Sequence, residues 1–269
     1  MTAPSLPNKN ELATKIDVEV CLDNLESLPI AIAAGANRIE LCSSLALGGL
    51  TPSIGMMRYA AQTATIPVYA MIRPRQGDFL YGSADLTSMQ FDIDAAAEAG
   101  LQGIVLGLLN RDGEIDGERL RPLVHQAQQH GLGITFHRAF DQCRDPLQAL
   151  ESIIELGCER ILTSGTHSNA LEGCEMLQQL IQQAAGRIAI MAGAGINAHN
   201  VREIVTRTGV RQIHLSGKSQ RHSQMQWIAE RAKMGAADQQ DFQIPVTSYD
   251  LIAEVRQILD SIHSFEGDE

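Results

Sequence analysis

Two short stretches of the chain place a cysteine two residues after a glutamate. VEVC spans residues 18–21 and IELC spans residues 39–42, and each lies in a run that otherwise has the composition of a buried strand. Because residues two apart in a strand point to the same face, each glutamate shares a face with its cysteine. Carboxylates and thiols on a buried face predict metal binding or acid–base chemistry in addition to packing.

The thiols suggest a soft-metal site. Cys21 and Cys42 hold equivalent positions at the ends of neighbouring predicted strands, which lie about 4.8 Å apart in a sheet. Two thiolates bind Cu(I), whereas Zn(II) requires further ligands, for which His137 and His214 are candidates. The alternative is that both cysteines are small buried hydrophobic residues, the commonest role of a free cysteine.

A second candidate chemistry is proton transfer. The stretch HRAFD, residues 137–141, follows the fifth predicted strand and contains His137 and Asp141. A histidine beside a carboxylate can transfer protons near neutral pH. Glu19 and Glu40 are candidates for the partner groups, or for hard-metal ligands together with His137. The alternative is a His–Asp pair that only holds a loop in place.

A third candidate is a site for a phosphate or a carboxylate. Three loops after predicted strands contain arginines suited to bidentate anion binding and glycines that allow the backbone to approach a ligand closely. The anion-binding candidates are Arg73, Arg75, Gly193, Gly195, Ser216 and Lys218. The alternative is that the glycines only form turns.

These residues must be positioned by an alternation of strands and helices. The predicted strands span residues 16–21, 37–42, 66–72, 102–108, 132–137, 160–164, 187–193 and 211–216. The predicted helices span residues 23–34, 87–99 and 117–130, and each ends just before a glycine. Asp145 and Asn197 are predicted helix N-caps. Eight such units in one chain predict a single-domain (β/α)8 TIM barrel, whose active site lies at the C-terminal ends of the strands.

The strands predict which side chains enter the barrel. One face of each strand must be apolar to pack on the helices, so the polar face points inward. The ionisable residues on this inward face are Glu19, Glu40, Arg73, His137 and His214. Burying so many ionisable groups is unfavourable unless they pair. An internal network in which Arg38 or Arg73 pairs with the glutamates is therefore expected beside any functional role.

The composition of the chain argues against some classes of protein. The net charge of −11 argues against nucleic acid as a partner. No apolar run is long enough to span a membrane, and five cysteines without a secretion signal favour reduced thiols in the cytoplasm. Residues 1–15 are expected to form a loose leader, and 16–269 the barrel domain, with a helix over 248–263 on its outside.

Several long strings together resemble the copper homeostasis protein CutC family. They are VEVC, GANRIELCSSLALGGLTPS, MIRPRQGDFLY, TFHRAFD, ILTSG, IMAGAGI and HLSGK, in order over roughly residues 16–250. The resemblance implies a (β/α)8 barrel, a cytoplasmic role in copper tolerance, and assembly as a homo-oligomer, either a dimer or a tetramer. Carried over to this chain, it implies Cu(I) as the bound ion and Cys21 and Cys42 as its ligands. The alternative function is a barrel enzyme that acts on a small anionic molecule, with or without a divalent metal ion.

Overall fold

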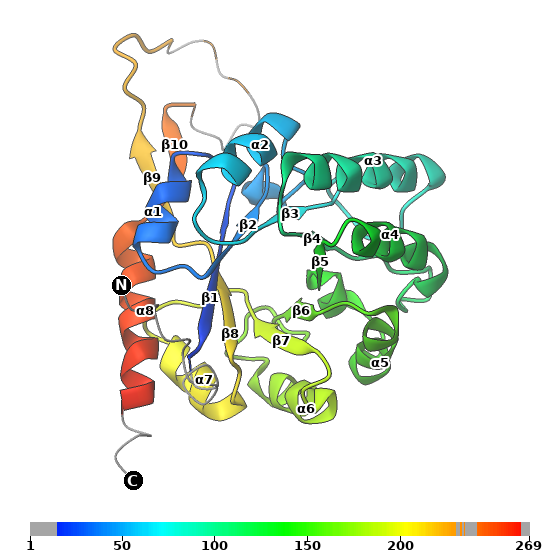
Figure 1. The fold of residues 1–269 in the computed structure, drawn as a ribbon. Coiled ribbons are helices and arrows are strands. Elements are labelled where there is room, and N and C mark those ends of the chain that lie inside the picture. The colour runs from blue at the N-terminus through cyan, green and yellow to red at the C-terminus, as the bar shows by residue number, and fades with distance from the viewer. Residues whose placement is uncertain (1–14, 230–231, 233, 235–240, 265–269) are drawn as a thin grey trace, which may run out of the picture.

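Eight parallel strands close into a barrel in the computed structural model, with β8 hydrogen-bonded back to β1 (Figure 1). The structure describes residues 15–229, 232, 234 and 241–264. The barrel strands are β1 (Asp17–Leu22), β2 (Arg38–Leu41), β3 (Val68–Met71), β4 (Gly103–Leu106), β5 (Gly133–Phe136), β6 (Arg160–Thr163), β7 (Ala189–Ala192) and β8 (Gln212–Leu215). Each overlaps a predicted strand, so the predicted (β/α)8 fold is confirmed. All but Lys15 of the expected leader lies outside the described residues.

One helix follows each barrel strand and covers the outside of the barrel (Figure 1). The helices are α1 (Ser27–Ala33), α2 (Ile54–Thr63), α3 (Ser83–Ala99), α4 (Gly117–Gln129), α5 (Pro146–Leu156), α6 (Cys174–Ala184), α7 (Val201–Thr208) and α8 (Tyr249–Ser264). Two short 3-10 helices, η1 (Leu45–Leu47) and η2 (Arg138–Gln142), lie in loops that follow strands.

The predicted helix ends at 34, 99 and 130 lie within one residue of the observed ends of α1, α3 and α4, whereas the predicted starts at 23 and 87 are each wrong by four residues. Asp145 accepts hydrogen bonds from the backbone N–H groups at the start of α5, and Pro146 is its first residue. Asn197 was expected to cap a helix, and this prediction is wrong. The residue before α7 is Asn200, while the side chain of Asn197 accepts a hydrogen bond from the backbone of His199 within the preceding loop.

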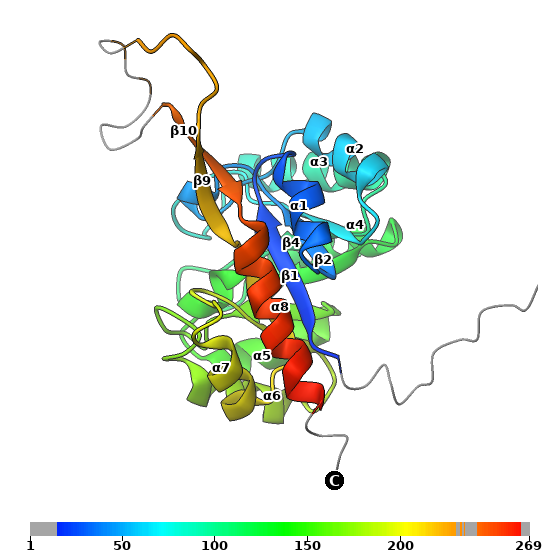
Figure 2. The same cartoon turned by 90° about the vertical axis from the view of Figure 1, so that its left-hand side faces the viewer.

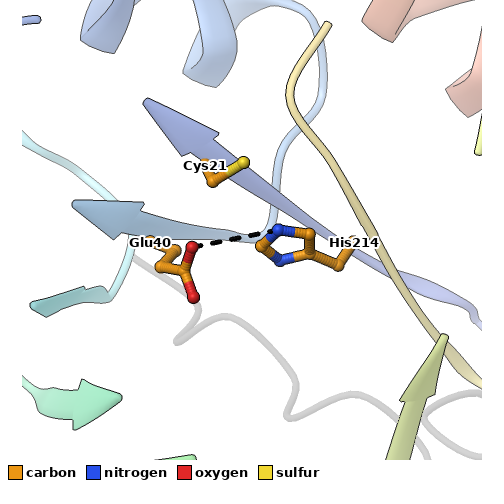
Figure 3. Close-up of side chains that lie close together, drawn as sticks. All are labelled: Cys21, Glu40 and His214. Atoms are coloured by element: carbon orange, nitrogen blue, oxygen red, sulfur yellow. Dashed lines mark ion pairs between the residues drawn. The ribbon is translucent and has the colours of Figure 1, made fainter. Parts of the chain in front are cut away.

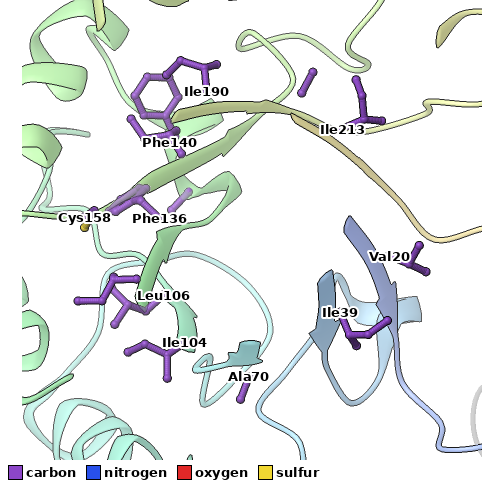
Figure 4. Close-up of a cluster of buried hydrophobic side chains, with 14 of the residues drawn as sticks. Val20, Ile39, Ala70, Ile104, Leu106, Phe136, Phe140, Cys158, Ile190 and Ile213 are labelled. Carbon is purple, nitrogen blue, oxygen red and sulfur yellow. The ribbon is translucent and has the colours of Figure 1, made fainter. Parts of the chain in front are cut away.

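The main hydrophobic core lies between the barrel and its helices. The outward residues of the strands are buried and apolar, and Figure 4 shows part of this layer, including Val20, Ile39, Ile104, Phe136 and Ile213. Because this outer layer satisfies the hydrophobic requirement of the fold, the barrel interior is free to hold polar side chains.

After β8 the described residues continue outside the barrel, first as two further strands and then as α8. β9 (Lys218–His222) pairs antiparallel with β10 (Gln243–Thr247), and the two form a ribbon that projects from one end of the barrel (Figure 2). α8 packs against α1 and α7 on the outside of the barrel. It lies within one residue of the predicted helix over 248–263 at both ends. Within the described ranges, no helix combines the length and the apolar character needed to cross a bilayer.

Candidate functional site

A polar layer fills the N-terminal part of the barrel. The guanidinium groups of Arg38 and Arg160 each lie 5.5 Å from the centre of the Tyr69 ring. Gly103 and Gly133 leave the space that this ring occupies, since a Cβ at either position would lie within 2.4 Å of a Tyr69 atom. Both guanidinium groups therefore lie within the range of a cation–π interaction with Tyr69.

Glu19 connects this layer to the residues above it. Its Oε2 accepts a hydrogen bond from Arg38, and its Oε1 lies 2.8 Å from Nδ1 of His214. Burial by itself would raise the pKa of Glu19, but the hydrogen bond from His214 and the charge of Arg38 outweigh it and lower this pKa to about 2. Glu19 is therefore a buried carboxylate anion. The expected internal ion pair exists, and Arg38 provides it.

The strand register shifts the two Glu-x-Cys stretches by two residues relative to each other. Cys21 on β1 lies opposite Glu40 on β2, and the N–H of Cys42 bonds to the carbonyl of Leu22. The predicted equivalence of Cys21 and Cys42 is therefore wrong by two residues. Cys42 lies one layer closer to the C-terminal end, where its Sγ donates to Oε2 of Glu40 across 3.5 Å.

Cys21, Glu40 and His214 form a group of metal-ligating side chains in the described part of the chain. One ligand atom from each of the three lies within 4.8 Å of the others, and all three residues are buried (Figure 3). Oε2 of Glu40 lies 3.9 Å from Nε2 of His214. The three side chains come from β1, β2 and the adjacent β8, so the closure of the barrel brings them together.

The environment shifts the pKa of every member of this group. Burial raises the pKa of Cys21 and of Glu40. Burial would lower the pKa of His214, but the acidic groups of Cys21 and Glu40 and the hydrogen bond to Glu19 raise it well above its usual value. Burial, followed by the charge of Glu40, raises the pKa of Cys42 well above normal. Burial therefore disfavours the thiolate form of both cysteines.

A cavity of about 1470 Å³ covers this group at the C-terminal end of the barrel. Cys21, Glu40 and His214 line its floor together with Met71. The loops after β1, β2, β3, β5, β6, β7 and β8 contribute to its walls, and β10 lines one side. The cavity therefore lies where the active sites of this architecture are found.

Arg73 lines the cavity but does not pair with a glutamate as the sequence analysis allowed. Its Nη1 donates to the carbonyls of Leu47 and Gly49, both at 3.0 Å, and its Nη2 donates to the carbonyl of Gly77. Its Nε has no partner within the described ranges. Arg75 lies outside the cavity wall, where it pairs with Asp78.

His137 is a buried neutral imidazole. Its Nδ1 accepts the backbone N–H of Ala139 at 3.1 Å, which assigns the ring proton to Nε2. Nε2 has no partner among the described residues. Burial, with a contribution from the charge of Arg73, lowers the pKa of His137 to about 3. A Cβ at Gly107 would lie 2.6 Å from Nδ1, so this glycine makes room for the ring.

The carboxylate of Asp141 holds the loop after β6 in place through hydrogen bonds. Its carboxylate accepts hydrogen bonds from the hydroxyl of Thr163, from the backbone N–H and hydroxyl of Ser164 and from the backbone N–H of Thr166. Arg138 pairs with it at 2.7 Å. These partners take the place of the predicted contact with His137, because η2 directs Asp141 toward the loop after β6 rather than back to β5.

The remaining anion-site candidates are separated by the structure. Gly195, Ser216 and Lys218 line the cavity. Gly193 lies at the end of β7, where a Cβ would fall 2.6 Å from Leu162, so its role is close packing. Of the six anion-site candidates, the structure brings four to the cavity, the fourth being Arg73.

Two further sets of residues line the cavity. Arg138, which belongs to the HRAFD stretch, and His167, whose role the sequence left open, line it from loops that follow β5 and β6. Gln243, Pro245 and Val246 line it from β10. No sequence pattern signalled β10, because among the described strands it pairs with β9 alone, outside the alternation of barrel strands and helices.

Comparison with known proteins agrees with this architecture. A family model described as the CutC family matches residues 16–219. A family protein CutC from Vibrio cholerae is 60% identical over 250 residues, which cover 93% of this chain and 98% of that protein. Another from Vibrio campbellii is 60% identical over 238 residues, with coverage of 88% and 96%. A crystal structure of a Streptococcus agalactiae protein, provisionally named the copper homeostasis protein CutC, is 37% identical with a TM-score of 0.70, and covers 74% of this chain and 97% of that one. On these matches, the chain belongs to the CutC family.

Proposed function

We propose that the protein binds Cu(I) at the C-terminal mouth of its barrel, with Cys21 as the first thiolate ligand and Cys42 as the second. The observation that carries this proposal is that Cys21 and Cys42 are free, buried thiols at the C-terminal ends of the neighbouring strands β1 and β2, with Cys21 on the cavity wall. Thiolates select Cu(I) among the common metal ions. The name of the Streptococcus agalactiae relative supports copper as the ion.

The surroundings of Cys42 support its role as the second thiol. Its Sγ donates a hydrogen bond to Glu40. Cys42 is therefore connected to the group of Cys21, Glu40 and His214 through that carboxylate. Gly49 covers it from the loop after β2, with a φ of +83° and a position from which a Cβ would lie 3.1 Å from Sγ. Glycine thus allows the loop to cover the thiol closely, and this cover keeps bulk water away from a bound soft ion.

A cytoplasmic location and assembly as a dimer or tetramer are part of the same proposal. All five cysteines are free, which suits a reducing compartment. Light scattering on the purified protein tests the assembly, and a monomer at micromolar concentration would contradict it.

An anaerobic Cu(I) titration against a chromophoric chelator tests the copper site. Wild type is expected to compete with the chelator, and Cys21→Ser and Cys42→Ser are each expected to lose this competition. Cys174→Ser is the matched control, because Cys174 is equally buried at the start of α6 and a serine can keep its hydrogen bond to Ala170. Equal competition by wild type and both site variants would contradict the proposal.

A second candidate function is an enzyme that acts on a small anionic molecule in the cavity. The observation that favours it is the buried guanidinium of Arg73, whose hydrogen bonds within the described part of the chain go to uncharged backbone carbonyls. A buried cation without a counter-charge is unfavourable, and a phosphate or carboxylate would supply that charge. His137 lines the same cavity, and its protonated Nε2 lacks a partner.

Calorimetric titration with inorganic phosphate and with succinate tests this candidate. One equivalent of at least one of the two anions is expected to bind to wild type, and His137→Phe is expected to weaken the binding. Arg187→Gln is the control, because Arg187 pairs with Glu151 on the outside of the barrel. If neither anion bound to wild type, or if both anions bound to His137→Phe as tightly as to Arg187→Gln, these two anions would be excluded at this site.

A further inference from the structure

The group formed by Cys21, Glu40 and His214 has the donor set of a divalent metal site rather than of a thiol pair. It offers one sulfur, one carboxylate and one imidazole from three adjacent strands (Figure 3). Zinc and its neighbours in the transition series bind this combination, whereas Cu(I) favours sulfur alone. The observations below concern only these three residues and Glu19, so they do not depend on the Cu(I) proposal.

The spacing of the group leaves room for an ion. Nε2 of His214 and Oε2 of Glu40 are 3.9 Å apart, which is too long for a hydrogen bond. Typical Zn–N and Zn–O bonds add up to about 4.2 Å, which exceeds this separation, so one ion can bond to both atoms in a bent arrangement. Cys21, opposite Glu40 in the strand register, supplies the third donor.

Glu40 carries a polar atom that the protein itself leaves unsatisfied. Its Oε1 is buried and has no hydrogen-bond partner among the described residues, and the residue is only 3% exposed. An unpaired buried carboxylate oxygen is unfavourable. A bound cation would remove this cost, because it neutralises the carboxylate as a whole.

Glu19 orients the histidine for such a role. Its Oε1 accepts the Nδ1–H of His214 at 2.8 Å, which leaves Nε2 as the ring atom directed at Glu40. Metal-bound histidines nearly always donate their other ring N–H to a carboxylate or carbonyl in this way. Arg38 in turn holds Glu19, so the orientation is fixed from below by an ion pair. Glu19 is therefore a positioning residue.

The charges of the group also balance for a divalent ion. The Glu19 anion is paired with the Arg38 cation. Bound to an ion, the three donors are a thiolate, a carboxylate and a neutral imidazole. Their two negative charges neutralise the ion, so no net charge remains buried.

We propose that Cys21, Glu40 and His214 bind one divalent transition-metal ion of the zinc class, with Glu19 as the positioning residue. Three protein ligands and a free position are typical of catalytic rather than structural zinc sites. The free position faces the cavity of about 1470 Å³. An oxygen of a small molecule in the cavity can occupy it.

Anaerobic titration of the full-length protein with Co²⁺ tests the site, since Co²⁺ reports its ligands by absorption. Wild type is expected to bind one equivalent and to show a thiolate-to-cobalt charge-transfer band that Zn²⁺ abolishes by competition. Cys21→Ser is expected to lose the band, and Glu40→Gln and His214→Gln to weaken binding. Glu19→Gln is expected to keep the band and lower the affinity about 10–100-fold, as the loss of an outer carboxylate does elsewhere.

Two variants separate this site from the copper site. Cys42→Ser is expected to keep the cobalt band while it loses competition for Cu(I), and Cys174→Ser to behave as wild type in both titrations. A wild type that takes up no Co²⁺, or a band that persists in Cys21→Ser, would overturn the zinc-class site and leave the copper proposal standing. Equal loss of the band in Cys42→Ser would also overturn the proposed ligand set, because it would place both ions on the thiol pair.

A measurement on wild type alone covers the case in which a variant fails to fold. Saturating Zn²⁺ is expected to slow the alkylation of Cys21, and mass spectrometry of the peptides identifies the protected residue. The alkylation rate of Cys143, which lies outside the cavity wall, is expected to stay unchanged. Equal rates at Cys21 with and without Zn²⁺ would overturn the site.

Discussion

Glu19 and His214 lie opposite each other on the neighbouring strands β1 and β8, and the carboxylate accepts the Nδ1–H of the imidazole at 2.8 Å. The same carboxylate accepts a hydrogen bond from Arg38 on β2. A buried anion thus lies between a buried guanidinium and a buried imidazole across the seam where the barrel closes. Glu19 therefore affects both the stability of the barrel, through Arg38, and the orientation of the candidate ligand His214.

Glu19→Gln is therefore expected to destabilise the fold strongly. Removing one partner of a buried ion pair leaves the other charge uncompensated, which typically costs about 3–5 kcal/mol. Urea denaturation at neutral pH measures the change in the free energy of unfolding. Glu151→Gln is the control, since it removes a carboxylate from an exposed pair with Arg187, and its effect is expected to be small. Similar stabilities for the two variants would contradict the buried network.

His137 is expected to make the protein sensitive to acid. Its pKa of about 3 in the folded state lies below the ordinary value of 6.5, so the unfolded chain binds the proton more readily. The stabilisation is fully present above pH 6.5 and is lost as the pH falls toward 3. The slope is about 1.4 kcal/mol per pH unit.

Urea unfolding of wild type and His137→Gln between pH 7.5 and 5 isolates this contribution. The stability of the wild type is expected to fall by about 2 kcal/mol more than that of the variant between pH 6.5 and 5. The difference between them should be constant above pH 6.5. Parallel stability profiles over the whole range would mean that the imidazole titrates normally in the fold.

Gly107→Ala is expected to disturb the His137 pocket. The added Cβ would lie 2.6 Å from Nδ1 of the imidazole, and such overpacking typically costs about 1–3 kcal/mol. Gly117→Ala is the matched control, because a Cβ there meets no atom within 4 Å and Gly117 begins α4. Thermal unfolding of both variants checks the prediction, and a Gly107→Ala protein as stable as the control would refute it.

The cysteines are expected to react slowly with an aromatic disulfide reagent in the native protein. The thiolate is the reactive form, and burial raises the pKa of Cys143 and of Cys158 to about 12. Cys143 is the only one of the five that is not fully buried, so it should react first. All five thiols should react in urea, and fast native modification of Cys158 would contradict its buried position.

Much of the barrel could be predicted from local patterns. Apolar residues alternate with polar ones along β1 and β2, and the sequence predicts all eight strands in their observed order. That alternation also decides which side chains face inward, because a strand has only two faces. The inward positions of Glu19, Glu40, His137 and His214 are therefore a property of each strand taken alone.

The partners of those side chains were decided by the tertiary structure. The stagger between neighbouring strands is set by the closure of the whole barrel, so no single strand shows that Cys21 lies opposite Glu40 rather than Cys42. For the same reason His214 meets Glu19 only when β8 returns to β1. Loops determine the partners of the other two site candidates. Arg73 donates to the backbone carbonyls of Leu47 and Gly49, and Asp141 accepts hydrogen bonds from the turn after β6. The sequence by itself thus determined which groups enter the barrel, and only the closed register decided which of them meet.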